Sequence, residues 1–233
     1  MLLITKRLLA CAELVPQGAR VADIGCDHGY LGIWLLRENR AAFVVASDLR
    51  EKPLESARKN ALKYGVSDQM AFVCADGLTG IEPESVDTIV CAGMGGDLIR
   101  MVLDASPWSL AGRHTLILQP QSSQYDLRMW LSEKGFVIDS ETPIEDAGHV
   151  YSAMRLRYTG SPHVLSPLHA FLSPEILASG SADLAAYLED TVRRLELAVV
   201  NMKNAKEPPE RLKFFETALD GAKEVRKRYA DGT

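Results

Sequence analysis

Residues 21–31 read Val21-Ala22-Asp23-Ile24-Gly25-Cys26-Asp27-His28-Gly29-Tyr30-Leu31. This stretch is the most informative part of the sequence, because an apolar run of strand length passes through two glycines into a helix-length segment. Glycine lets the backbone approach a ligand closely, and the start of a helix presents free amide donors. The stretch therefore predicts a strand, a tight turn and a helix, with a ligand held at the turn. A turn without a ligand is the alternative.

The acidic residues of this turn indicate which ligand it suits. Dinucleotide-binding turns have the pattern Gly-x-Gly-x-x-Gly, so that a pyrophosphate rests on the start of the helix. Here only Gly25 and Gly29 fall in the turn, and Asp23 and Asp27 flank them. Two carboxylates would repel a pyrophosphate, but they would attract a ligand that carries an ammonium and a sulfonium. S-adenosylmethionine has both charges.

Short apolar runs alternate with amphipathic segments along the first part of the chain. Strands are expected at residues 20–24, 42–47, 70–74, 86–91 and 114–118. Helices are expected at about residues 5–15, 30–38, 53–64, 96–103 and 126–134. This alternation predicts an α/β fold with a parallel sheet covered on both faces. Residues 136–139 and 151–158 form a last strand pair without a helix between them, which favours the Rossmann-like sheet of class I methyltransferases.

Acidic residues also follow the second and third expected strands. Asp48 ends the run 42–47, and Asp76-Gly77 follows the run 70–74. The carboxyl ends of parallel strands meet at one edge of a sheet, so these residues would share a crevice with Asp23. Asp48 could accept both hydroxyls of a ribose, and Asp76-Gly77 fits the edge of an adenine ring. Each could also be a simple strand end or turn, but together they favour a nucleoside site.

The fourth and fifth expected strands end in motifs that could receive a methyl acceptor. Ala92-Gly93-Met94-Gly95-Gly96 leaves a slot for a flat group, although packing alone could require its glycines. The Asn/Asp-Pro-Pro-aromatic pattern that grips an exocyclic amine is absent. Gln119-Pro120-Gln121 places amides where they could hydrogen-bond the edge of a base or lie idle. Lys6 and Arg7 could reach a phosphate or the cofactor carboxylate, or serve only as surface cations.

The sequence changes character after Tyr158. Residues 160–167 are rich in glycine, serine and proline and mark a linker. A seam of residues spaced three or four apart follows, at Leu184, Leu188, Thr191, Leu195, Ala198 and Met202. Pro208-Pro209 interrupts the seam, and Leu212, Phe215, Leu219 and Ala222 continue it. We expect a catalytic domain over residues 1–160, then a linker and an antiparallel α-helical hairpin (coiled coil) over residues 161–233. Two helices packed separately on the main domain are the alternative.

Composition restricts the class of protein. The 233 residues are 47% hydrophobic and 24% charged, which is typical of a globular protein, and no apolar stretch reaches the ~20 residues of a membrane span. The N-terminus lacks the order of a signal peptide, so a cytoplasmic protein without membrane contact is expected. The net charge of −5 argues against nucleic-acid binding through bulk positive charge, but a local basic patch would suffice. The spacing of cysteines and histidines indicates no metal site.

Several motifs, in order, resemble those of the bacterial tRNA adenine-N1-methyltransferases that act at position 22 of tRNA. They are Thr5-Lys6-Arg7-Leu8, Asp23 to Leu31, Ala92 to Gly96, and Leu118-Gln119-Pro120 with Asp126-Leu127-Arg128-Met129-Trp130-Leu131. The resemblance covers nearly the whole chain, including the C-terminal two-helix coiled coil. Two positions depart from the family pattern: Gly29 stands where alanine is frequent, and Gln121 stands where asparagine is common.

The resemblance implies an enzyme that uses S-adenosylmethionine to form 1-methyladenosine in tRNA. It implies cofactor contacts at Asp23, Gly25, Asp27, Asp48, Asp76, Gly77 and Gly93. We expect their neighbours Arg7, His28, Gly29, Tyr30, Leu31, Leu49, Ala92 and Met94 to complete the cofactor site. The expected catalytic residues are Asp27, Tyr30 and Met94. The expected tRNA contacts are Lys6, Gln119 and Gln121, with Lys203, Lys206, Arg211, Lys213, Arg226, Lys227 and Arg228 on the hairpin.

Two other functions stay open on the residues alone. The same crevice would serve a methyltransferase that acts on a small molecule or a protein. A non-catalytic binding protein could instead use the hairpin for assembly. A monomer is favoured over an oligomer, and a nicotinamide enzyme is disfavoured because the phosphate-binding pattern is missing.

Overall fold

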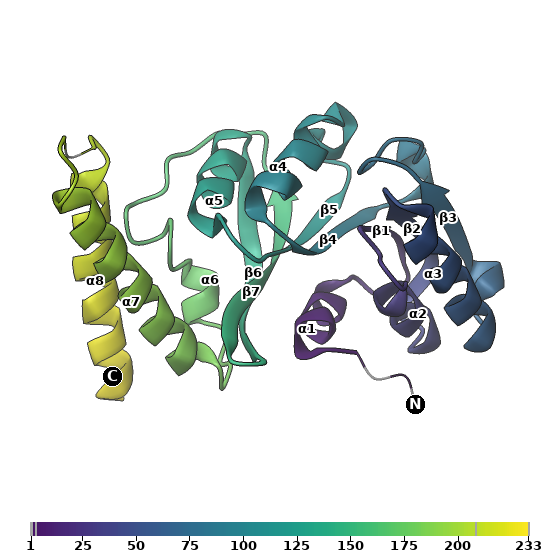
Figure 1. The fold of residues 1–233 in the computed structure, drawn as a ribbon, viewed down its shortest axis with the longest axis horizontal. Coiled ribbons are helices and arrows are strands. Elements are labelled where there is room, and N and C mark those ends of the chain that lie inside the picture. The colour runs from purple at the N-terminus through teal and green to yellow at the C-terminus, as the bar shows by residue number, and fades with distance from the viewer. Residues whose placement is uncertain (1, 3, 208, 233) are drawn as a thin grey trace.

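The computed structural model describes residue 2, residues 4–207 and residues 209–232. Within them, seven strands form one mixed sheet in the order β3-β2-β1-β4-β5-β7-β6 (Figure 1). The strands are β1 (Ala19–Ile24), β2 (Ala41–Asp48), β3 (Met70–Cys74), β4 (Thr88–Met94), β5 (Thr115–Pro120), β6 (Phe136–Asp146) and β7 (His149–Tyr158). The helices are α1 (Lys6–Leu14), α2 (Tyr30–Arg37), α3 (Glu51–Lys63), α4 (Gly96–Asp104), α5 (Gln124–Glu133), α6 (Pro174–Leu177), α7 (Leu184–Lys203) and α8 (Leu212–Ala230).

The pairing of the strands confirms the predicted fold class. β1 to β5 pair in parallel, and β7 lies antiparallel between β5 and β6. One reversed strand at the end of an otherwise parallel sheet is the arrangement expected for a Rossmann-like class I methyltransferase. The helices α1 to α5 that accompany the sheet were also expected. For α1, the Thr5 hydroxyl accepts a hydrogen bond from the Leu8 amide and caps the helix, as the sequence predicted.

The central strands divide their side chains between two cores. Successive residues of a strand point to opposite faces of the sheet. Val21 and Val90 join the core that contains α1, α2 and α3. Ala22 and Ile89 join the core that contains α4 and α5. The chain therefore leaves β1 toward one face of the sheet and leaves β4 toward the other.

The last strand pair is longer than the sequence predicted. The expected strands covered residues 136–139 and 151–158, whereas β6 continues to Asp146 and meets β7 through the two-residue turn Ala147-Gly148. Both turn residues have positive φ, of 52° and 77°, as tight hairpins require. Residues 140–143 are Ser-Glu-Thr-Pro, a composition that does not favour a strand by itself, and pairing with β7 overrides that preference.

Other boundaries also moved. β4 and β5 extend to Met94 and Pro120, so residues 92–94 and 119–120, expected in loops, end strands instead. Helix α5 begins at Gln124 rather than at residue 126. The short helix α6 was not predicted.

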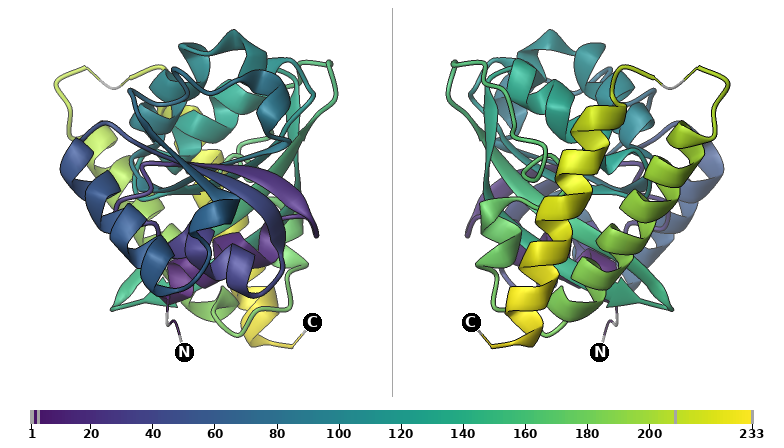
Figure 2. Two further views of the ribbon diagram at one scale, coloured as in Figure 1. Left: turned by 90° about the vertical axis from the view of Figure 1, so that its right-hand side faces the viewer. Right: turned by 90° about the vertical axis from the view of Figure 1, so that its left-hand side faces the viewer.

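The C-terminal helices form the expected hairpin. Figure 2 (right) shows α7 and α8 running antiparallel beside one another, and Figure 1 places them beyond the β6–β7 end of the sheet. They share a core with α6, to which α7 contributes Leu184, Tyr187, Leu188, Val192, Leu195 and Val199, and α8 contributes Phe215, Ala218, Leu219 and Ala222. The predicted seam is thus partly correct, because Thr191, Ala198 and Met202 are only half-buried. Of the predicted Pro208-Pro209 break, Pro208 lies outside the described residues; α7 ends at Lys203 and α8 begins at Leu212.

Among the described residues, no helix combines the length and apolarity that crossing a membrane requires.

A buried ion pair joins the sheet to the hairpin. Arg128 of α5 and Glu141 of β6 form an ion pair with side chains that are 1% and 0% exposed. Ser173, which caps α6, donates to the other Glu141 oxygen at 2.6 Å. Arg128 also donates to the Tyr187 hydroxyl of α7 at 3.3 Å. One charged pair therefore connects four elements that are distant in sequence.

Removal of one member of this pair should destabilise the fold strongly. Glu141→Ala leaves the buried Arg128 guanidinium without its counter-charge, and the free energy of unfolding should fall by about 3–5 kcal/mol in urea titrations. Asp139→Ala on the same strand removes a more exposed pair with Arg155 and should lower it by less than about 1 kcal/mol. Equal, small losses in both variants would contradict the role of the buried pair.

Candidate functional site

The turn after β1 is bent by left-handed backbone at three of its residues. Gly25, Asp27 and Gly29 have φ of 68°, 49° and 72°. Asp27 is the informative one, because non-glycine residues adopt this conformation at a cost that aspartate tolerates better than most. A Cβ built on Gly29 would lie 2.9 Å from Cβ of Ala57, so this position requires glycine where α2 begins against α3. The turn is therefore held in one narrow shape.

Two carboxylates lie beneath this turn. Asp23 is 4% exposed, and its Oδ2 atom has no hydrogen-bond partner within the described residues. Burial raises the pKa of Asp23 to about 7; a backbone hydrogen bond from Gly32 acts in the opposite direction, and the nearby Asp48 raises the pKa further. Asp48 accepts the amides of Asp27 at 3.3 Å and of Arg50 at 2.9 Å. A buried carboxylate with an open oxygen suits a ligand that brings a positive charge.

Asp48 and Asp76 lie on neighbouring strand ends, as predicted. Asp48 pairs with Cys74 in the β2–β3 register, and the Ala75 amide donates to the Asp48 carbonyl at 3.1 Å. Asp76 follows directly and is exposed. Gly77 has a φ of 59°, and Ser47 donates its hydroxyl to the Gly77 carbonyl at 3.0 Å. The ends of β1, β2 and β3 therefore present three carboxylates along one edge of the sheet.

The end of β4 approaches the turn from the other side. The register of β4 against β5 is irregular between Ala92 and Met94, and Gly93 has a φ of 78°. A Cβ built on Gly25 would lie 2.9 Å from Cε of Met94, so the Met94 side chain covers Gly25. The structure thus brings Met94 and the β1 turn together, as the predicted slot requires.

Arg7 enters the same region from the first turn of α1. Its Nη1 atom would lie 3.9 Å from a Cβ built on Gly93. Its Nε donates to Asp146 at 3.1 Å, and its guanidinium lies 5.2 Å from the centre of the Tyr151 ring. Arg7 is therefore oriented toward Gly93 by groups at the tip of the β6–β7 hairpin.

The remaining turn residues divide between surface and core. Asp27, His28 and Tyr30 are exposed, with the His28 and Tyr30 rings 5.9 Å apart and the Asp27 carboxylate 3.6 Å from His28 Nε2. Leu49 is 67% exposed beside Asp48, and Ala92 is half-buried. Leu31 is buried in the core, which leaves its backbone for any ligand contact.

The structure engages two predicted acceptor contacts within the protein: Gln119 is buried, and the exposed Lys6 is held in an ion pair. Gln119 is fully buried and accepts the Gly93 amide at 3.0 Å, so its side chain supports the β4 end. Lys6 forms an ion pair with Asp183 at 2.9 Å and donates to the Glu145 carbonyl. Gln121 is exposed, with Nε2 3.7 Å from a Cβ built on Gly93. Of the three, Gln121 alone faces the slot directly.

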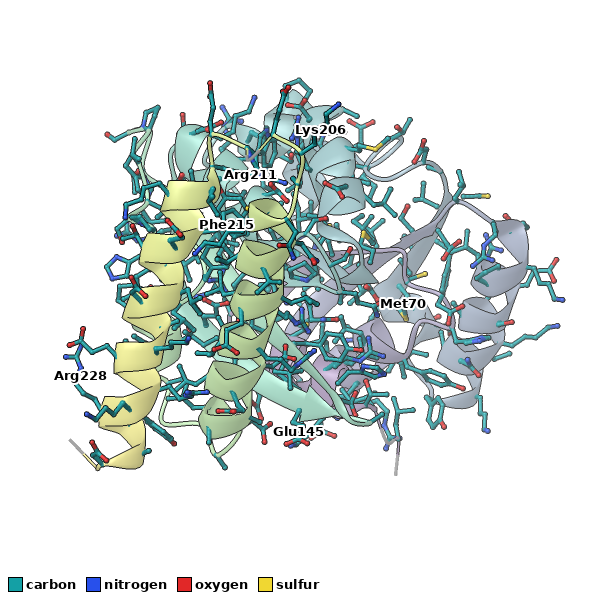
Figure 3. All side chains as sticks on the ribbon, turned by 60° about the vertical axis from the view of Figure 1, so that its left-hand side comes forward. Met70, Glu145, Lys206, Arg211, Phe215 and Arg228 are labelled. Carbon is teal, nitrogen blue, oxygen red and sulfur yellow. The ribbon has the colours of Figure 1, made fainter. Side chains whose placement is uncertain are left out.

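The predicted hairpin cations differ in their position along the hairpin and in whether they form ion pairs. Figure 3 shows Lys206 and Arg211 at the loop end of the hairpin and Arg228 at the opposite end of α8. Lys203, Arg226 and Arg228 pair with the hairpin carboxylates Glu216, Glu189 and Glu224. In the part of the chain that the structure describes, Lys206, Arg211, Lys213 and Lys227 have no carboxylate within ion-pair distance.

The sequence did not predict the residues that contact and orient the side chains and backbone of the site. Asp146, which orients Arg7, lies beyond residue 139, where the first strand of the pair was expected to end, and Tyr151 follows the hairpin turn on β7. The signal that could have found them is Asp146-Ala147-Gly148, a short polar, glycine-containing turn between two strands. Asn60, whose amide donates to the His28 carbonyl at 3.0 Å, carried no such signal.

Comparisons with known proteins agree with this geometry. Residues 4–154 match a sequence family described as a methyltransferase domain. The tRNA (adenine(22)-N(1))-methyltransferase of Bacillus subtilis is 35% identical over 151 residues, a region that spans 65% of this chain and 63% of that relative, slightly under two thirds of its length. The crystal structure of Streptococcus pneumoniae Sp1610 with S-adenosyl-L-methionine covers 96% of this chain and 100% of its own, with 31% identity and a TM-score of 0.80. The crystal structure of the B. subtilis M1A22 tRNA methyltransferase TrmK covers 98% of this chain and 99% of its own, with 26% identity and a TM-score of 0.79.

The buried Asp23 should make the free protein less stable as the pH rises. Its folded-state pKa of about 7 lies above the ordinary aspartate value of 3.8. Its contribution to the free energy of unfolding is therefore complete below pH 4 and is lost as the pH rises through 7. Between pH 5 and pH 8 this loss should amount to roughly 2–3 kcal/mol of unfolding free energy. Asp23→Asn should remove that part of the slope in urea titrations, whereas Asp76→Asn, at an exposed carboxylate, should keep it. A slope unchanged by Asp23→Asn would refute the interpretation.

Proposed function

This chain belongs to the family of tRNA (adenine(22)-N(1))-methyltransferases, and from that membership we propose that it methylates ring nitrogen 1 of the adenine at position 22 of tRNA. The observation that carries the proposal is the meeting of the β1 turn with the β4 end, where the buried Asp23 underlies the turn, Asp48 accepts the Asp27 amide and Met94 lies against Gly25. The methyl donor is S-adenosylmethionine, which supplies an electrophilic methyl group on a sulfonium. The proposed substrate also fits the cytoplasmic location expected from the sequence.

The chain offers a complementary group for each polar part of the donor. Asp23, with its open buried oxygen, suits the ammonium, and Arg7 suits the carboxylate. Asp48 lies where a ribose diol would be accepted, and Asp76-Gly77 lies beside it for the adenine edge. The pKa of Asp23 is about 7 in the free protein, so the carboxyl group is largely protonated below that pH. A cationic ligand bound beside it would favour the ionised carboxylate and form an ion pair with it.

The acceptor side requires alignment rather than a strong base. Ring nitrogen 1 of adenine has a free lone pair at neutral pH, so no proton has to be removed before transfer. Catalysis then rests on holding the reacting atoms near a line. We assign Met94 and Tyr30 to the walls of the slot, and we assign Asp27 to stabilising positive charge that develops on the adenine ring. Gln121 is placed to meet the base edge, and the buried Gln119 acts through the Gly93 amide.

Binding of tRNA is assigned to the basic loop end of the hairpin. Lys206, Arg211 and Lys213 gather there, and their charges are not neutralised by ion pairs within the described residues. At the other end of α8, Lys227 is exposed, while Arg226 and Arg228 are paired. The two groups are separated by about 14 residues of helix, or roughly 20 Å. Since neutralised cations contribute less to phosphate binding, the loop end should dominate.

Unmodified tRNA incubated with methyl-labelled donor tests the proposed activity. We expect label in tRNA, and digestion with nucleoside mapping should place 1-methyladenosine at position 22. A transcript with guanosine at that position is the control and should stay unlabelled. Label found only in protein or in a small molecule would overturn the proposal in favour of a different acceptor, and no label anywhere would favour a binding protein.

Asp27→Ala should slow methyl transfer much more than it weakens tRNA binding. The carboxylate is exposed on the turn and acts, in this proposal, on charge that exists only as the methyl moves. We expect kcat to fall roughly 100-fold, the usual effect of deleting one electrostatic contact to a transition state, with the Kd for tRNA within about twofold. Asp76→Ala should instead raise the KM for the donor. Unchanged kcat in Asp27→Ala would remove this residue from the mechanism.

The double variant Lys206→Gln/Lys213→Gln should weaken tRNA binding and reduce its salt dependence. Removing both lysine–phosphate interactions should lower the slope of log Kd against log salt by roughly two, and by roughly one in each single variant. Lys227→Gln removes one exposed cation at the other end of α8 and should change both quantities less than either single variant does. A larger effect of Lys227→Gln would place the tRNA at the opposite end of the hairpin.

A further inference from the structure

A cavity lies between α5 and the C-terminal hairpin. It has a volume of about 340 Å³, within the range of small-ligand sites, and opens to solvent. Its walls come from the first turn of α5, from the side of α7 that runs from Tyr187 to Met202, from Arg211 just before α8 and from Phe215 of α8. None of the residues proposed to hold the donor lines this cavity. Figure 3 shows Arg211 and Phe215 together near the loop end of the hairpin.

One wall of the cavity is aromatic. The rings of Tyr125 and Phe171 stack in parallel, with centres 4.8 Å apart and planes inclined by 10°. Phe215 meets both rings edge-on at 5.2 Å. Aromatic groups of this kind bind flat heterocycles by stacking, and they do so for any base.

The floor of the cavity includes an arginine with unpaired hydrogen-bond donors, which also lines a neighbouring cavity beside β6. Arg128 lines this floor with a side chain that is 1% exposed, and Nη2 alone serves Glu141 and Tyr187. The Nε and Nη1 atoms of Arg128 are buried and have no partner within the described residues. Buried donors are seldom left unpaired, so the cavity is suited to a group that brings an acceptor oxygen or nitrogen.

The rim carries charges of both signs, because Asp126 and Asp190 line the cavity together with Arg194 and Arg211. Arg211 lies over the Phe215 ring, 5.6 Å from its centre, and its guanidinium has no carboxylate partner in the described chain. Arg194 also lines the cavity, although Asp190 neutralises it at 2.5 Å. An aromatic wall, buried donors and a free cation at the mouth together suit a base with its phosphate.

The cavity begins close to the acceptor slot. The Gln121 amide donates to the Met94 carbonyl, and the Gly96 amide donates to the Ser122 carbonyl, both at 2.9 Å. Tyr125 follows Gln121 by four residues, which limits the distance between their Cα atoms to about 14 Å. A strand whose base occupies the slot can therefore reach the cavity within a few nucleotides.

We propose that this cavity binds an unpaired base of the tRNA, a few nucleotides from the target adenine. This inference rests on the proposed function. The ring of the base lies against the aromatic wall, an acceptor on its edge meets Arg128, and the adjoining phosphate meets Arg211. Holding a second base outside the stack would fix the strand while the target adenine is exposed for methylation.

The test uses Tyr125→Leu, which removes the ring but keeps an apolar side chain, and Arg211→Gln, at an exposed position. Each variant should raise the KM for tRNA about tenfold or more, as expected when a stacking or phosphate interaction is removed, with the donor Kd within about twofold of wild type. Arg113→Gln is the matched control, because Arg113 is exposed ahead of β5 and neither lines the cavity nor pairs with a residue that does. It should behave as the wild type does.

Transcripts with single abasic residues near position 22 identify the base. One of them should bind wild-type protein about tenfold more weakly, and Tyr125→Leu should show no further loss with that transcript. If every abasic loss adds to the loss from Tyr125→Leu, or if both variants methylate tRNA normally, the inference fails while the proposed function stands. The inference also fails if the variants bind free adenosine monophosphate more weakly while their KM for tRNA stays unchanged. If Tyr125→Leu does not fold, Arg211→Gln with the same transcripts decides. Wild-type protein that methylates no tRNA would defeat both proposals.

Discussion

The site exists because the chain leaves two adjacent parallel strands toward opposite faces of the sheet. β1 leads to α2 in one core and β4 leads to α4 in the other, so no connection covers the sheet edge between them. Such a reversal of strand order leaves a crevice at the carboxyl ends of the strands. Gly25 and Met94 form its two sides, and Asp23, Asp48 and Asp76 follow from it because their strands end at the same edge.

Charge gives this crevice its selectivity. Asp23 is buried without a full set of partners, and its raised pKa reflects a carboxylate that the folded chain does not satisfy by itself. A diphosphate would add negative charge to this surrounding, whereas an ammonium relieves it. Under the proposed function, a few side chains in one turn would adapt the kind of sheet that carries pyrophosphate in dinucleotide-binding proteins to a cationic ligand.

The parts of the fold that depend on local pattern could be predicted, and the parts that depend on distant pairing could not. The β1 turn, the strand-end aspartates and the helical hairpin follow from glycine positions and periodicity, which act within a few residues. Glu141 and Arg128 read as ordinary surface charges in sequence, and only the packing of α6 and α7 over them makes them buried. Gln119 likewise reads as a rim residue, but its strand continues past it and turns the side chain inward. The length of β6 depended on β7 in the same way.

The first turn of α1 is connected on both sides. Lys6 is bound to Asp183 at the start of the C-terminal hairpin, and its neighbour Arg7 extends from the tip of the β6–β7 strands to the glycine of the β4 end. The Glu145 amide, next to Asp146 in the β6–β7 hairpin, also donates a hydrogen bond to Asp183, at 3.0 Å. The hairpin is therefore bonded to the same helical turn that, in the proposed function, supplies an arginine to the methyl donor. Under that proposal, two consecutive side chains would connect the tRNA-binding hairpin with the donor site.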